Sequence, residues 1–172
     1  MHNQKTLSIW LLPDSKTINY RSIINHVSKT LGSVSIIPHI TLTSSFNNSE
    51  EYSVEKLREV FLNQASFTIE AEKIDTGNAY FQSLFLNIKM NPIIKELRKK
   101  SLKYFDCREK NDYIPHMSLA YGKFEKSDKN NIINGLAKSL LNHKIHISSV
   151  AIAENDEYNL KWKIIKKVNL DD

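Results

Sequence analysis

Two short stretches of the chain repeat one pattern of residue types. Ile37-Pro38-His39-Ile40-Thr41-Leu42 and Ile114-Pro115-His116-Met117-Ser118-Leu119 both read Ile-Pro-His-x-hydroxyl-Leu. An imidazole takes up or releases a proton near neutral pH, and a hydroxyl donates a hydrogen bond. Each stretch therefore combines a proton-transfer group with a hydrogen-bond donor.

The spacing of the polar residues predicts that each pair lies on one face of a β-strand. Successive side chains of a strand alternate between its two faces, so residues i and i+2 point the same way. His39 and Thr41 would share one face, and His116 and Ser118 would share one face of another strand. Their apolar neighbours would turn to the core.

Two facing imidazoles suit in-line displacement at phosphorus. A neutral imidazole would take a proton from the attacking water, and an imidazolium would give one to the leaving alcohol. The hydroxyls of Thr41 and Ser118 would donate hydrogen bonds to the non-bridging oxygens and stabilise the developing charge without a metal. A lone histidine in an apolar strand is more often a core residue, so the matched pair, and neither motif alone, indicates function. The sequence leaves open which of His39 and His116 is the acid and which the base.

Alternating and helical patterns predict the elements that position these residues. Strands are predicted at 6–12, 36–44, 67–74, 79–89, 114–121, 145–153 and 160–168, and helices at 15–31, 50–61, 92–105 and 128–141. The expected caps are Asp14 or Ser15, Asn47-Asn48-Ser49, Asn91, and Ser127 or Asp128, with Gly32 ending the first helix. The third helix is expected to turn Arg98, Lys99, Lys100 and Lys103 outward.

The order of elements contains a weak repeat. A strand and a helix precede each histidine motif, with Trp10 lying 29 positions before His39 and Phe85 lying 31 before His116. We interpret this as two related lobes that face each other across a cleft within one domain, residues 1–172.

Bulk composition indicates an ordinary globular protein. The chain has 172 residues, 41% hydrophobic and 25% charged, with a net charge of +5. That charge is compatible with an anionic ligand but does not by itself indicate nucleic acid. We see no apolar run of membrane-spanning length and no signal peptide. Cys107 is the single cysteine, which fits a reducing, cytoplasmic setting. We expect a monomer.

Three stretches together resemble the two-histidine (2H) phosphoesterase superfamily and, within it, the plant and fungal cyclic phosphodiesterases. They are Ser8-Ile9-Trp10-Leu11-Leu12-Pro13, Pro38-His39-Ile40-Thr41-Leu42 and Pro115-His116-Met117-Ser118-Leu119-Ala120-Tyr121-Gly122. The paired His-x-Thr/Ser motif is the signature of the superfamily, whereas Trp10 and Tyr121 are a weaker match to the subfamily. The order, spacing and chain length agree, so the resemblance covers essentially the whole chain.

The resemblance implies a bilobal α+β fold in which antiparallel sheets line a central cleft and helices lie outside. It implies hydrolysis of small cyclic phosphodiesters with no metal or cofactor. Nucleoside 2′,3′-cyclic phosphates would open to 2′-phosphates, and ADP-ribose 1″,2″-cyclic phosphate, a by-product of tRNA splicing, to the 1″-phosphate. The implied site comprises His39 and His116 as the acid/base pair, Thr41 and Ser118 as phosphate ligands, and Trp10 and Tyr121 as cleft residues that contact the substrate or an ordered water.

The two aromatic positions have a second interpretation. Trp10 lies in an apolar strand, where core packing is as good an explanation as base stacking. Tyr121 follows His116 by an odd number of residues, so alternation places it on the core face. It reaches the cleft only if the strand bends or ends there, which Gly122 would permit.

Some residues depart from the family patterns, and two other functions are alternatives to the one that the resemblance implies. The sequence has no cysteine pair such as plant members carry. Thr43-Ser44-Ser45 stands where the bacterial RNA-cyclic-phosphodiesterase branch tends to have a basic residue, which argues against that branch. A 2H enzyme acting on RNA 2′,3′-cyclic phosphate ends or 2′-5′ linkages is the first alternative. A catalytically silent nucleotide-binding module is the second, and the intact motifs argue against it.

The remaining reactive residues are expected to play no part. His143 and His146 would face opposite sides of a strand and make a poor metal pair. Cys107, close to Arg108 and Lys110, could have a lowered pKa but is expected to be incidental. Surface positions are expected for Arg108, Lys110, Lys161, Lys163 and Lys167, although lysines gathered beside the cleft would favour RNA ends.

Overall fold

Strands form the centre of the protein and helices lie outside them. The computed structural model describes residues 6–47, 54–107, 112–141 and 143–171. The strands are β1 (Thr6–Pro13), β2 (Ile40–Asn47), β3 (Phe67–Thr76), β4 (Leu84–Ile88), β5 (His116–Ala120), β6 (Lys144–Asp156) and β7 (Lys161–Asn169). The helices are α1 (Tyr20–Leu31), α2 (Val54–Val60), α3 (Pro92–Tyr104) and α4 (Lys126–Leu140), with a short 3₁₀-helix, η1 (Tyr80–Gln82). The predicted α+β class is confirmed.

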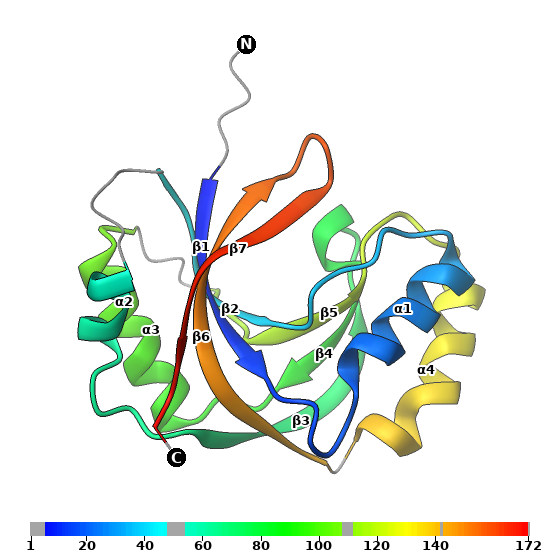
Figure 1. Cartoon of the computed structure of the whole chain (residues 1–172). Coiled ribbons are helices and arrows are strands. Elements are labelled where there is room, and N and C mark those ends of the chain that lie inside the picture. The colour runs from blue at the N-terminus through cyan, green and yellow to red at the C-terminus, as the bar shows by residue number, and fades with distance from the viewer. Residues whose placement is uncertain (1–5, 48–53, 108–111, 142, 172) are drawn as a thin grey trace.

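All strand pairs are antiparallel, and the strand order is β2-β1-β6-β3-β4-β5, with β7 also paired to β6. β6 connects two parts of this arrangement. Its first residues pair with β3, and the rest lies between β1 and β7. We call β2, β1, β7 and the second part of β6 the first lobe, and β3, β4 and β5 the second lobe (Figure 1).

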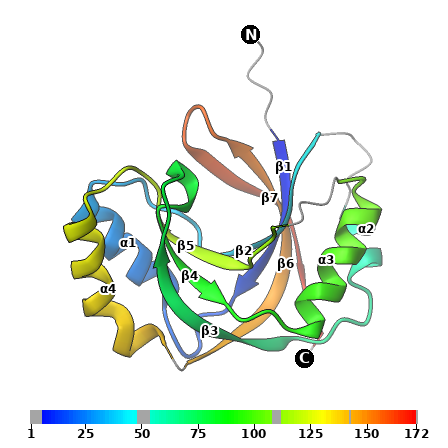
Figure 2. The same cartoon turned by 180° about the vertical axis from the view of Figure 1, so that it is seen from behind.

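The helices cover the outer sides of the two lobes (Figures 1 and 2). α2 contacts β7 and α3 contacts β2, whereas α1 contacts β5 and α4 contacts β3. α1 follows β1 in the chain yet packs on the second lobe, and α3 follows β4 yet packs on the first. The strand-helix-strand order therefore occurs in both halves of the chain. In each half, however, the helix packs on the lobe to which its preceding strand does not belong. None of the helices in the described part of the chain is long and apolar enough to span a membrane.

Two predicted helix boundaries are confirmed. Asn91 caps α3 by accepting a hydrogen bond from the Ile94 amide at 2.8 Å, and Gly32 ends α1 in the left-handed conformation with φ 65°. The predicted caps at Asp14 or Ser15 are wrong, because α1 begins at Tyr20 with Asn19 as its cap. The predicted caps at Ser127 or Asp128 are wrong as well, because α4 begins at Lys126 with Glu125 at the cap position.

The Asp14 carboxylate is engaged elsewhere, 2.7 Å from Nδ1 of His146. The expected cap at Asn47-Asn48-Ser49 falls on residues 48–53, outside the described residues. Some predicted strands have other bounds: β2 begins and ends later than expected, β5 is shorter at both ends, and η1 occupies the start of the segment expected to extend from 79 to 89.

β1 is buried on both faces and thereby connects the core to the cleft. Leu7, Ile9 and Leu11 belong to the main hydrophobic core, whereas Trp10 and Leu12 belong to a second cluster with Ala151 and Ala153 of β6. Each large apolar side chain removed from water contributes about 1.5–3 kcal/mol. This two-sided burial fixes β1, and with it the neighbouring motif strand β2.

Candidate active site

The two motif strands stand at opposite ends of the strand order, yet β2 and β5 are in contact, because the sheet curls round until its two ends meet (Figures 1 and 2). A cleft of about 350 Å³ lies there. Its lining includes all six predicted site residues: Trp10, His39, Thr41, His116, Ser118 and Tyr121. The fold therefore brings the two histidine motifs, which are far apart in the sequence, into one cleft.

His39 precedes β2 and is 6% exposed. Its Nδ1 lies 2.6 Å from the carbonyl oxygen of Ile37. Because a carbonyl can only accept, Nδ1 carries the proton, and the neutral ring keeps its free lone pair on Nε2. The ring stacks on Trp10, with 3.6 Å between ring centroids and 11° between planes. Trp10 therefore supports the imidazole and is itself only 1% exposed.

His116 has the same arrangement in the second lobe. Its Nδ1 lies 2.9 Å from the carbonyl oxygen of Ile114, and its ring meets the Phe85 ring edge-on at 5.3 Å. The strand registers agree as well, since Trp10 pairs with Thr41 and Phe85 with Ser118. The repeat predicted from sequence is thereby a repeat of structure, with an aromatic ring beside each imidazole.

Burial controls the charge of both imidazoles. Loss of water around His39 lowers its pKa to about 4, opposed by the bond to the Ile37 carbonyl and assisted by repulsion from His116. Burial also lowers the pKa of His116, opposed by its bond to the Ile114 carbonyl. Repulsion from His116 thus adds to the effect of burial in keeping His39 neutral.

The two motif hydroxyls differ in exposure. Thr41 is half-buried, whereas Ser118 is 7% exposed with Oγ 3.5 Å from the carbonyl oxygen of Phe81. Tyr121 faces the cleft because β5 ends at Ala120 and Gly122 turns the chain with φ 147°. Its burial raises the pKa of Tyr121 to about 12, and a hydrogen bond with Ser118 opposes the shift. Both predicted placements of Tyr121 are therefore observed in part, because the residue belongs to the main hydrophobic core and also lines the cleft.

An aromatic group at one end of the cleft was not foreseen. The Phe81 ring meets Tyr121 at 5.3 Å and Trp162 at 6.1 Å, and Tyr121 meets Trp162 at 5.1 Å. Phe81 belongs to η1 and Trp162 to β7, so this end is formed by elements that approach only in three dimensions. Trp162 stood out as one of two tryptophans in the chain, but nothing in its local pattern indicated the cleft.

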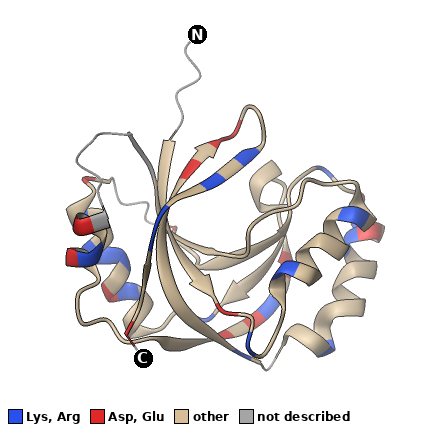
Figure 3. Ribbon diagram, viewed as in Figure 1, with Lys and Arg blue, Asp and Glu red and all other residues tan. Residues whose placement is uncertain are grey.

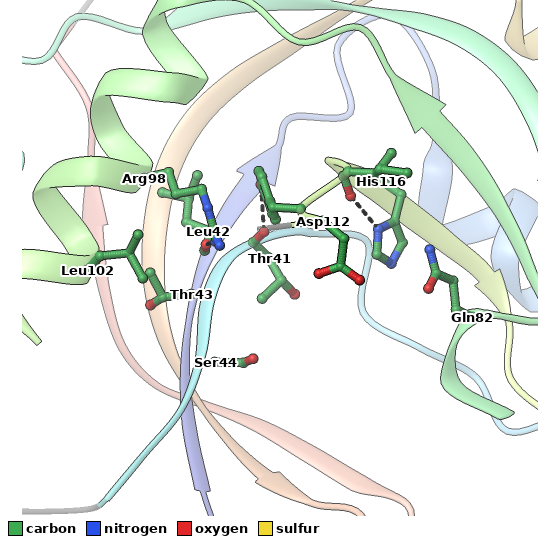
Figure 4. Close-up of a pocket in the computed structure, with 11 residues that line it drawn as sticks. Thr41, Leu42, Thr43, Ser44, Gln82, Arg98, Leu102, Asp112 and His116 are labelled. Atoms are coloured by element: carbon green, nitrogen blue, oxygen red, sulfur yellow. Dashed lines mark hydrogen bonds between the residues drawn. The ribbon is translucent and has the colours of Figure 1, made fainter. Parts of the chain in front are cut away.

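A second cavity of about 280 Å³ continues from the cleft toward α3 (Figure 4). Both share Thr41, Ser44, Gln82 and His116 in their linings. Arg98 lines this second cavity and is 8% exposed, so the predicted outward position is wrong. The buried face of α3 consists of Ile94, Leu97, Arg98 and Ser101. Position 98 follows the helical period of that face, and only its residue type suggested the surface.

Other candidate groups lie outside the cleft lining. His146 pairs with Asp14, and no group of three or more His, Cys, Asp or Glu among the described residues could hold a metal ion. The suggested lowering of the Cys107 pKa is wrong: burial raises that pKa, although a hydrogen bond with Thr43 opposes it. Arg108 and Lys110 fall outside the described residues.

The lysines of β7 are not among the residues that line the cleft. Lys161, Lys163 and Lys167 are exposed, as expected of a surface. Across the β6–β7 ladder, Asp156 faces Lys161 and Glu154 faces Lys163, and Figure 3 shows these opposite charges on the two strands of the hairpin.

Solved structures of bacterial proteins share this fold. Escherichia coli LigT complexed with phosphate aligns with a TM-score of 0.62 and 12% identity over 99% of both chains. LigT complexed with 3′-AMP gives 0.60 and 11%, over 98% of this chain and 99% of LigT. TT0787 of Thermus thermophilus gives 0.59 and 12%, over 96% of this chain and 97% of that one. At these identities the likeness shows the fold, and this fold brings the two motif histidines of the chain to one cleft.

The family follows from sequence comparison. The family model described as cyclic phosphodiesterase-like protein matches residues 5–170, and the chain belongs to that family. The cyclic phosphodiesterase of Arabidopsis thaliana is 22% identical over 125 residues, 72% of this chain and 69% of the relative. The protein is a phosphodiesterase, as predicted.

Proposed function

We propose that the protein hydrolyses small cyclic phosphodiesters by a two-histidine mechanism that needs no metal. The proposed substrates are nucleoside 2′,3′-cyclic phosphates, opened to 2′-phosphates, and ADP-ribose 1″,2″-cyclic phosphate, opened to the 1″-phosphate. The observation that carries the proposal is the matched pair of imidazoles lining one cleft, each with Nδ1 held by a backbone carbonyl. Both leave Nε2 for proton transfer.

Burial favours His39 as the general base and His116 as the general acid. His39 is the more deeply buried and stacks on Trp10, so it stays neutral near pH 7 and can accept a proton from water. His116 is half-buried. The negative charge of a bound phosphodiester raises the pKa of a nearby imidazole, which lets His116 carry the proton for the leaving oxygen.

The two motif hydroxyls would bind the phosphoryl group during this transfer. Thr41 and Ser118 each lie two positions after a histidine and line the same cleft. Their hydrogen bonds strengthen as negative charge grows on the non-bridging oxygens.

Phosphorus NMR tests the reaction. The purified protein would be given 2′,3′-cyclic AMP, and separately ADP-ribose 1″,2″-cyclic phosphate, in EDTA. We expect clean opening to one regioisomer, and we expect His39→Ala and His116→Ala each to lower kcat by about 10²- to 10⁴-fold. The exposed His26 of α1 gives the matched control, His26→Ala. Failure to open either compound would refute the proposed substrates, and near-normal turnover in either cleft variant would refute the mechanism.

The assignment of acid and base needs a second substrate. In a phosphodiester of 4-nitrophenol, the leaving group is 4-nitrophenolate, which departs without taking up a proton. Relative to a cyclic nucleotide, His116→Ala should therefore recover activity on it and His39→Ala should not. Recovery in His39→Ala instead would reverse the assignment.

An enzyme of RNA 2′,3′-cyclic phosphate ends is the second candidate. The cavity that continues from the cleft past Thr41 and His116 favours it, because a polynucleotide needs room beyond its terminal ribose. Turnover of cyclic-phosphate-ended oligonucleotides without turnover of mononucleotides would select this alternative, and binding without hydrolysis would indicate a silent module.

A further inference from the structure

Arg98 is a buried cation without an acidic partner in the described part of the chain. Its side chain reaches from α3 toward β2 and is 8% exposed (Figure 4). The ion pairs formed among the described residues do not include it. Arginine is almost never fully buried unless it is paired, because removing its charge from water is costly. Among the described residues, therefore, no carboxylate neutralises the charge of Arg98, and an anionic ligand could do so.

The guanidinium is held in place by two contacts. Nη1 donates a hydrogen bond to the carbonyl oxygen of Leu42, and the group lies 3.7 Å from the centroid of the Tyr113 ring. The Tyr113 hydroxyl in turn donates to the carbonyl oxygen of Thr41 at 2.9 Å. An arginine has five N–H donors, so the bond to Leu42 leaves others for a ligand. A fixed fork of donors loses little freedom when it binds phosphate.

The position of Arg98 relates it to the catalytic pair. The carbonyl that it binds belongs to Leu42, three residues beyond His39, or roughly 10 Å along an extended chain at about 3.3 Å per residue. The cavity that Arg98 lines also contains Thr41 and His116. A group bound at Arg98 would therefore belong to the same ligand as a phosphodiester between the two imidazoles.

We propose that Arg98 forms a subsite for a second phosphate of the substrate, one attached to the 5-position of the ribose that carries the cyclic phosphate. This inference rests on the proposed function. RNA ends and ADP-ribose 1″,2″-cyclic phosphate both contain a ribose of this kind, whereas a simple nucleoside 2′,3′-cyclic phosphate does not. The subsite would make the protein selective for the 5-phosphorylated class.

One acidic side chain belongs to the same cavity. Asp112 lines it, and Figure 4 shows its carboxylate turned toward the space between Thr41 and His116. Unlike Arg98, Asp112 is exposed, so water screens its repulsion of an anion. The part of the repulsion that water does not screen gives the proposal a second, opposite consequence: Asp112→Asn should raise kcat/KM for a substrate with a second phosphate, but by less than Arg98→Gln lowers it.

The test compares two substrates that differ by one group, adenosine 2′,3′-cyclic phosphate with and without a 5′-phosphate. We expect the wild-type protein to prefer the 5′-phosphorylated compound in kcat/KM by tenfold or more. Arg98→Gln keeps a donor for the Leu42 carbonyl. It should lower kcat/KM by about 10- to 100-fold for the 5′-phosphorylated compound and leave kcat/KM for the other compound unchanged. Lys99→Gln is the matched control, since it removes the same charge from an exposed neighbour on α3.

Equal losses on both substrates in Arg98→Gln would show a purely structural role and overturn the proposal, as would the absence of a preference in the wild type. If neither compound is hydrolysed, the proposed function fails, and calorimetry then tests the subsite alone. Adenosine 2′,5′-bisphosphate should bind at least tenfold more tightly than adenosine 2′-phosphate, and Arg98→Gln should abolish the difference. Equal affinities would refute the subsite.

Two further substrates test which class of molecule supplies the second phosphate. ADP-ribose 1″,2″-cyclic phosphate and a trinucleotide ending in a 2′,3′-cyclic phosphate would be compared in kcat/KM. Arg98→Gln should weaken both, and the compound with the higher wild-type value identifies the source. An unchanged kcat/KM for both in Arg98→Gln would overturn the proposal.

Discussion

Acidification should destabilise the protein through His39. In the folded protein the pKa of His39 is about 4, compared with an ordinary value of 6.5. Between pH 6.5 and pH 4, His39 is therefore protonated in the unfolded chain but largely neutral in the folded protein. The free energy of unfolding falls as the pH falls through this range. Each pKa unit corresponds to about 1.4 kcal/mol, so the contribution lost is about 2 kcal/mol at pH 5 and about 3 kcal/mol at pH 4.

Replacement of the imidazole isolates this effect. In His39→Asn the side-chain amide can still donate to the Ile37 carbonyl, but nothing titrates at that position. Urea unfolding followed by circular dichroism at pH 7.5, 6 and 5 gives the free energy of unfolding for each protein. The wild type should lose about 2 kcal/mol more than His39→Asn between pH 7.5 and pH 5.

Two controls separate His39 from the other histidines. His26 is exposed on α1 and is not among the residues that line the cleft, so His26→Asn is the matched control for replacing a histidine by asparagine. Burial also lowers the pKa of His116. His116→Asn should therefore reduce the pH dependence of the free energy of unfolding separately from His39→Asn. If His39→Asn and the wild type lose the same stability between pH 7.5 and pH 5, burial does not hold His39 neutral, and the reasoning behind its role as base is wrong.

Four further substitutions, and one control at Gly135, test the residues that support the site. Thr41→Ala and Ser118→Ala should each lower kcat by about 10- to 100-fold with little change in KM, because each removes a hydrogen bond that strengthens in the transition state; steady-state kinetics would show this. Trp10→Ala should lower the free energy of unfolding by about 3–5 kcal/mol in urea, since Trp10 is 1% exposed and stacks on an imidazole. Gly77→Ala should cost about 1–3 kcal/mol and lower kcat/KM, because a Cβ there would collide with the backbone of η1, whereas Gly135→Ala, with open space around it, should be neutral or stabilising.

The motif strands could be predicted because their information is local. The two-residue spacing of His39 and Thr41 states which face they share, and the aromatic residue at a similar distance before each histidine marks the paired strand. Both inferences needed only strand alternation and comparison of the two halves of the chain. The register confirms them, since Trp10 pairs with Thr41 and Phe85 pairs with Ser118.

The residues that surround the motif side chains could not be predicted, because their places depend on contacts between distant segments. Arg98 was expected at the surface from its residue type, although its helical position matches the buried face of α3. Tyr113 meets the Thr41 carbonyl over a separation of 72 positions. η1 looked like the beginning of a strand, so Phe81 carried no sign of its place beside Trp162. Sequence periodicity reports which face a residue takes, but not which distant element will face it.

The long strand β6 has a consequence for how the protein acquires its activity. β1 stands near the start of the chain, and its partner on one side is β6, so Thr6 pairs with Asn155. β6 also supplies the partner of β3, and the two lobes are paired through it. Such long-range pairing makes folding slow, because large loops must close before the contacts form. The two imidazoles can meet only after residues 144–156 are in place, so a growing chain remains inactive until that late segment joins the strands on either side of it.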